Sequence, residues 1–174
     1  FMEEALKTDE AYKNIEYVGT VYGDDEYTKS YDETLGLINL YPELKGIIIP
    51  STAGAPAVAK CVMDEGKSIK VTGLTLASDM AEYIKAGICD ATFLWNPIEL
   101  GYAASYAAVA LCKGEITGAV GESYEVPGIG ALTIEESTAV GASGELEPTG
   151  GTVSFLNKLN EFTAETVDEL VDIL

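Results

Sequence analysis

The sequence contains no histidine, no arginine and no glutamine. Histidine is the usual general base, a member of most catalytic triads and the commonest metal ligand, so its absence argues against the most familiar enzyme and zinc chemistry. Without arginine, the chain lacks the side chain that holds carboxylates and phosphates through two parallel hydrogen bonds. By exclusion, we predict that any ligand is neutral and polar.

Positive charge is also scarce. Ten lysines stand against 29 acidic residues, which gives a formal net charge of −19. A field this negative repels nucleic-acid backbones and anionic lipid headgroups. We therefore expect no nucleic-acid partner and no role at a membrane surface, and we interpret the acidity as that of a solubilising surface.

Cysteines are few, and long apolar runs are missing. The three cysteines are far apart, lie in apolar surroundings and form no CxxC pattern: Cys61, Cys89 and Cys112. They are predicted to be small buried residues rather than metal ligands, with one disulfide among them as the alternative. No run of about 20 apolar residues could span a membrane. The chain begins inside a helical pattern, and we expect it to be part of a longer protein.

The rest of the sequence alternates between strand-like and helix-like segments. Runs rich in β-branched residues predict strands at 15–22, 46–50, 70–74 and 91–95. Helical patterns precede, separate and follow them, at about 1–13, 26–41, 53–64, 78–85 and 97–112. Such alternation predicts an α/β lobe of three α-β-α layers around a mostly parallel sheet.

The pattern changes after Gly114. Two short strands are predicted at 123–126 and 130–134, on either side of a Pro-Gly turn. A loop rich in Gly, Ser, Glu and Pro is expected at 141–151, and a strand or an extended connector at 153–156. An amphipathic helix is predicted at 163–174.

Polar residues follow the predicted strands, and the carboxyl ends of parallel strands meet at one edge, where open α/β sheets bind ligands. Asp24 and Asp25 also fall there, but helix capping or surface charge is the favoured interpretation for them. Trp95 could instead be a core residue, and Ser51 with Thr52 could simply cap a helix. The candidate ligand-binding residues are Pro50, Ser51, Thr52, Thr75, Trp95 and Asn96.

Nothing in the sequence marks a nucleophile beside a base, and no phosphate-binding glycine motif is present. We therefore predict that the protein is not an enzyme and that it uses no cofactor and no metal.

Three segments carry a family resemblance: YPELKGIIIPST at 41–52, VTGL at 71–74 and LWNPIELGYAA at 94–104. The chain resembles the sugar-type solute-binding proteins of ABC importers, in the branch that includes rhamnose-binding and autoinducer-2-binding proteins. Segments 21–25, 28–30 and 124–130 fit the same branch. The resemblance implies that Pro50, Thr52 and Trp95 contact the ligand. Ser51, Thr52 and Asn96 depart from the autoinducer-2 pattern, which favours a rhamnose-like sugar.

The resemblance also implies a division of the chain. Residues 1–96 would form most of a C-terminal lobe, and 117–174 would return to complete it. The helix in 97–116 would pack on an N-terminal lobe that precedes this chain. Residues 100–112 carry no charge, so we expect the fragment to self-associate through helix 97–112.

By resemblance, the protein would act outside the cytoplasm, in the periplasm or as a surface lipoprotein, and deliver a sugar to a membrane permease. The alternative is the effector-sensing domain of a sugar-responsive transcription regulator of the same fold. A DNA-binding region before residue 1 would favour that alternative, and a secretion signal would favour transport.

Overall fold

The computed structural model describes residues 2–140, 146–156 and 158–171. The chain divides into two compact units. The first, which we call the sheet unit, comprises Val21–Pro97 with Lys158–Leu174. The second, the hairpin unit, comprises Phe1–Thr20 with Ile98–Asn157.

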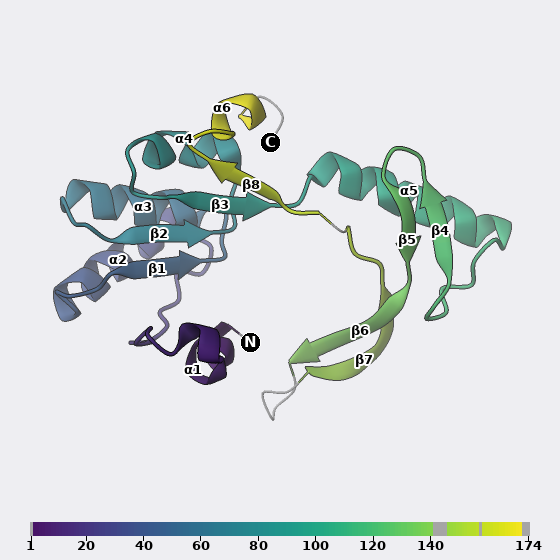
Figure 1. Cartoon of the computed structure of the whole chain (residues 1–174), viewed down its shortest axis with the longest axis horizontal. Helices are drawn as coiled ribbons and strands as arrows, with labels where there is room; N and C mark the ends of the chain where they lie inside the picture. The colour runs from purple at the N-terminus through teal and green to yellow at the C-terminus, as the bar shows by residue number, and fades with distance from the viewer. Residues whose placement is uncertain (1, 141–145, 157, 172–174) are drawn as a thin grey trace. The chain divides into compact units, whose positions relative to one another are not determined.

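The sheet unit is built on four short strands in the order β1-β2-β3-β8 (Figure 1). β1 and β2 pair in parallel, and a parallel bridge between Leu74 and Phe93 joins β2 to β3. Only β8 runs antiparallel, beside β3. The prediction of a mostly parallel sheet is confirmed. The strands are β1 (Gly46–Ile49), β2 (Lys70–Gly73), β3 (Ala91–Leu94) and β8 (Asn160–Thr163).

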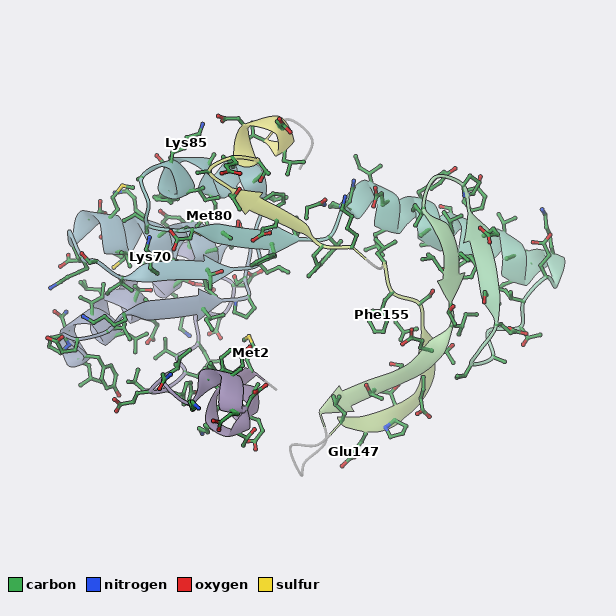
Figure 2. All side chains as sticks on the ribbon, viewed as in Figure 1. Met2, Lys70, Met80, Lys85, Glu147 and Phe155 are labelled. Carbon is green, nitrogen blue, oxygen red and sulfur yellow. The ribbon has the colours of Figure 1, made fainter. Side chains whose placement is uncertain are left out.

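Helices α2 (Tyr27–Leu40), α3 (Gly54–Asp64), α4 (Ala77–Lys85) and α6 (Val167–Leu170) pack around this sheet. The main core lies where α3, α4 and α6 meet the strands, and Met80 lies between α4 and the sheet (Figure 2). Phe162 and Met80 are completely buried there. Burial of a side chain of this size contributes about 1.5–3 kcal/mol.

The hairpin unit contains α1 (Met2–Thr8), the 3-10 turn η1 (Glu10–Tyr12), and most of α5 (Pro97–Lys113). Two antiparallel hairpins follow, β4 (Ser123–Val126) with β5 (Gly130–Thr133) and β6 (Glu135–Val140) with β7 (Leu146–Val153). A loop before β4 is closed by the carboxylate of Glu122, which accepts backbone hydrogen bonds from Thr117, Gly118 and Ala119 at 2.7, 2.9 and 3.1 Å.

The strand predicted at 15–22 is wrong. None of its residues is in a strand, and the Tyr22 side chain is 73% exposed. A strand is stabilised by the hydrogen-bonded ladder to a neighbour and by burial of one face. The residues of this segment belong to none of the ladders between the strands that the structure describes, so its β-branched composition alone does not make it a strand.

The end of the chain also differs from expectation. Residues 146–151, predicted as loop, lie in β7, while 141–145 are outside the described residues. The predicted helix 163–174 is reduced to α6: Thr163 belongs to β8, and 172–174 are outside the described residues. Residues 154–156 form a connector rather than a strand. β8 escaped prediction because only Phe162 among its four residues is buried.

Cys61 and Cys89 are buried, as predicted, but Cys112 is exposed, and all three are free thiols. The prediction failed for Cys112 because α5, although uncharged over residues 100–112, buries only Ala103 and Ala110. In the described part of the chain, no helix is both long and apolar enough to cross a bilayer.

Candidate functional site

The candidate site is the edge of the sheet at the carboxyl ends of β1, β2 and β3. The three strands point the same way, so the segments that follow them emerge together. Adjacent strands lie about 4.8 Å apart, which separates the ends of β1 and β3 by about 10 Å. The structure thus brings the predicted residues of the sheet unit to one edge, with Pro50 after β1, Thr75 after β2, and Trp95 and Asn96 after β3.

Ser51 is tied to two other segments. Its Oγ donates a hydrogen bond to Oδ1 of Asp25 at 2.5 Å and accepts one from the backbone N–H of Gly54 at 2.9 Å. The alternative interpretation of Ser51 as a capping residue is therefore confirmed, because its hydroxyl accepts from the first N–H of α3, while the N-cap residue Ala53 makes no side-chain cap. Pro50 and Thr52, on either side of Ser51, are exposed.

Asp25 reaches this edge although the strand expected before it is absent. Asp24 and Asp25 both have positive φ, 52° and 56°, a conformation that residues other than glycine seldom adopt. Asp24 forms an ion pair with Lys29 at the start of α2. Sequence reasoning did not find the contact between Asp25 and Ser51, because 26 residues separate the two in the chain.

Thr75 lies beneath the edge rather than on it. Its side chain is fully buried, and its Oγ1 has no hydrogen-bond partner among the residues described. Its backbone N–H donates to the carbonyl oxygen of Phe93 at 3.2 Å. A buried hydroxyl without a partner costs about 1–3 kcal/mol. Thr75 therefore offers an unused donor directly under the strand ends.

Gly73, which lies in the VTGL segment but is not among the predicted site residues, sets the spacing between β1 and β2. A Cβ atom added to Gly73 would lie 1.9 Å from the carbonyl oxygen of Ile49, the residue before Pro50. The same oxygen accepts a hydrogen bond from the N–H of Leu74 at 3.1 Å. Only glycine permits this close approach.

Trp95 directly follows β3 and is 38% exposed. It is not among the residues of the buried clusters in the described parts of the chain. An exposed indole has a flat apolar face against which a ligand can pack, and the half-buried Asn96 beside it adds an amide that can donate and accept hydrogen bonds. Across the described residues, no group of three or more Cys, Asp or Glu side chains is placed to hold a metal ion.

The chain is similar to solved structures of sugar transporters. An ABC transporter solute-binding protein from Clostridium phytofermentas, solved with bound L-rhamnose, shares 35% identity over 99% of this chain and 54% of its own, with a TM-score of 0.82. A sugar ABC transporter protein from Actinomyces odontolyticus shares 34% identity over 97% of this chain and 50% of its own, with a TM-score of 0.75.

Likeness of fold extends further. LsrB from Clostridium saccharobutylicum, in complex with AI-2, is 19% identical, and the match covers 96% of this chain and 52% of that one with a TM-score of 0.77. The chain thus spans about half the length of the solved proteins that it matches.

The homologous proteins are solute-binding proteins rather than enzymes, which confirms the prediction of a non-catalytic protein. Their fold is that of type 1 periplasmic binding proteins, and the sheet unit has the α/β arrangement of one such lobe. The family model described as a periplasmic binding protein domain matches residues 1–116. The chain belongs to this family of periplasmic binding protein domains.

Proposed function

We propose that the full-length protein is the extracytoplasmic solute-binding component of an ABC importer and that it binds a neutral, rhamnose-like sugar. The observation that carries the proposal is the 35% identity, over 99% of this chain, to a solute-binding protein with L-rhamnose bound. The chemistry of the edge agrees with it. Hydroxyl, amide and indole groups suit a polyol, and no arginine exists in the chain to hold an anionic one.

The proposed ligand contacts are Pro50, Ser51, Thr52, Thr75, Trp95 and Asn96. Trp95 would pack against the apolar C–H face of the sugar ring, while Asn96 and the 50–52 segment would bond its hydroxyls. Thr75 would contribute only if its buried hydroxyl turns toward the ligand or bonds it through a water. These residues would form one wall of a cleft, and a second lobe would supply the other.

In this proposal the sugar stabilises a closed arrangement of two lobes, and a membrane permease recognises that arrangement. The protein would act in the periplasm or as a lipoprotein on the cell surface. Helix α5 would pack on the other lobe. In the fragment, its exposed apolar side chains, such as Ile98 at 69% exposure, would drive self-association.

Thermal unfolding of the full-length protein with a panel of sugars tests the proposal. A ligand present at 100 times its Kd stabilises the folded state by about 2.7 kcal/mol, so L-rhamnose should raise the Tm by several degrees. A sugar acid such as D-glucuronate should not. If no neutral sugar raises the Tm, the proposed function is wrong.

A pair of variants then locates the site. Trp95→Ala should weaken sugar binding at least tenfold, because it removes the largest apolar surface at the edge. Lys70→Ala is the control, since Lys70 lies at the opposite end of β2, where it bonds Asp90 and the carbonyl of Gly87 (Figure 2). Equal losses in the two variants would place the sugar elsewhere.

A further inference from the structure

We propose that Asp25 is a positioning residue for the ligand-binding edge. Its carboxylate orients the hydroxyl of Ser51 and thereby fixes the path of the backbone at 50–52. The inference rests on the proposed function, because it assigns Asp25 to the same edge. Asp25 itself need not touch the sugar.

A set of hydrogen bonds surrounds Ser51. A hydroxyl has one hydrogen to donate, and here it goes to Asp25 at 2.5 Å. A lone pair of the same oxygen then faces the N–H of Gly54 at 2.9 Å, while the Ser51 carbonyl accepts from the N–H of Ala55 at 3.0 Å. Hydrogen bonds to an ionised group are roughly twice as strong as those between neutral groups. Asp25 is thus the only charged member of this set.

The loop that carries Asp25 has a strained backbone. Two consecutive non-glycine residues at positive φ are held in place only when their surroundings fix them. Each aspartate has its own partner, Lys29 for Asp24 and Ser51 for Asp25. The partner of Asp24 is therefore local, in the first turn of the helix that follows the loop, whereas Asp25 attaches the strained loop to the segment after β1.

Atoms of α2 and of the start of α3 pack closely beside this loop. A Cβ atom on Gly23 would lie 2.2 Å from Oγ of Ser30, and one on Gly54 would lie 3.1 Å from the same atom. Ser30 is buried, so the loop, α2 and the start of α3 meet around it with no room for larger residues. A shift of the loop is consequently passed on to the start of α3 and to residues 50–52.

Asp24 and Asp25 form a matched pair for the test. They share the same charge, exposure and backbone region, and differ in the partner of the carboxylate. Asp25→Ala removes the bond to Ser51, whereas Asp24→Ala makes the same change of charge and leaves that bond in place. Asp25→Asn is the conservative variant, because its amide oxygen still accepts from Ser51 and asparagine tolerates positive φ.

Calorimetry of the full-length protein with L-rhamnose gives the first readout. Asp25→Ala should weaken binding about tenfold, and Ser51→Ala at least as much, because it also removes the bond from the N–H of Gly54. The double variant should bind no more weakly than Ser51→Ala, because the bond between Asp25 and Ser51 is already lost in that single variant. Asp25→Asn and Asp24→Ala should stay within about twofold of the wild type. Equal losses from Asp24→Ala and Asp25→Ala, or additive losses in the double variant, would overturn the proposal.

Amide hydrogen exchange without sugar gives the second readout. The N–H of Gly54 should exchange faster in Asp25→Ala and Ser51→Ala, and at the wild-type rate in Asp24→Ala and Asp25→Asn. If the wild type binds no sugar, the proposed function fails, yet the exchange of Gly54 still decides the role of Asp25. Unchanged exchange in Asp25→Ala overturns the inference even where sugar binding is intact.

Discussion

Replacement of Gly73 by alanine should separate β1 from β2 at the point where the binding edge begins. The added Cβ would lie 1.9 Å from the carbonyl oxygen of Ile49 and 2.6 Å from its carbon. Both neighbours are backbone atoms, so no side chain can rotate away. The strands must therefore move apart by more than about 1 Å, since closer non-bonded contacts are too repulsive.

The cost follows from two effects. Overpacking against rigid neighbours costs about 1–3 kcal/mol. The movement also breaks or lengthens the hydrogen bond from Leu74 to Ile49, now 3.1 Å, and a buried polar group left without a partner costs about 1–3 kcal/mol. We expect Gly73→Ala to lower the free energy of unfolding by roughly 2–5 kcal/mol. Sugar affinity of the full-length protein should fall as well, because Pro50 follows Ile49 directly.

Urea unfolding followed by circular dichroism measures the stability, with Gly36→Ala as the matched control. Gly36 is exposed in α2, and nothing lies within 4 Å of the Cβ that alanine would add there. In a helix interior alanine is about 1 kcal/mol more favourable than glycine, so Gly36→Ala should raise the free energy of unfolding. Wild-type stability in Gly73→Ala would refute the close approach of the two strands and the reasoning built on it.

Three further predictions concern other parts of the chain. Phe162→Ala should lower the free energy of unfolding in urea by about 3–5 kcal/mol, whereas Phe155→Ala, which truncates an exposed ring, should lower it by less than about 1 kcal/mol. Similar losses of stability in the two variants would contradict the burial of Phe162 in the core. In the native protein a thiol reagent should modify Cys112 alone, and modification of all three cysteines at one rate would contradict the burial of the other two. Backbone hydrogen bonds to its carboxylate, of which the bond from Thr117 has the largest effect, lower the pKa of Glu122 below the usual 4.5. The ionised carboxylate should therefore stabilise the fold fully above pH 4.5, and this contribution should disappear as the pH falls through the lowered pKa. In acid titrations followed by urea unfolding, Glu122→Gln should differ most from wild type above pH 4.5 and least in acid; a constant difference would be evidence against that reasoning.

The central strands and helices of the sheet unit were predictable because their signals are local. Gly46–Ile49 is an apolar run between a lysine and a proline, and α4 (Ala77–Lys85) has its apolar residues on one face and a glycine soon after its end. In these elements the apolar pattern and the residues that end a strand or helix indicate the same first and last residues. The elements that failed depend instead on a neighbour. A strand at 15–22 would have to join a hydrogen-bonded ladder, and these residues belong to none of the strands that the structure describes, whereas β8 forms beside β3.

The candidate site, like the fold, could be predicted only in part. Its location followed from topology, because alternation of strands and helices places Pro50, Thr75 and Trp95 at one edge whatever their side chains do. How deeply each of these residues is buried could not be predicted from the sequence. Thr75 is fully buried while Trp95 is 38% exposed, although both come shortly after a strand with the same direction. Depth depends on which helix covers the strand end, and that is a property of packing rather than of sequence pattern.

The residues that shape the edge are not those that face it. Gly73 sets the distance between β1 and β2, and Asp25 holds Ser51. Neither is among the predicted ligand-binding residues, because glycine has no side chain and Asp25 was interpreted as a capping or surface residue. A wall whose backbone is fixed in this way loses little conformational entropy when a ligand binds, so more of the contact energy remains as affinity. Substitutions at Gly73 and Asp25 should therefore alter sugar binding through the position of residues 50–52, whereas Trp95 should act through contact alone.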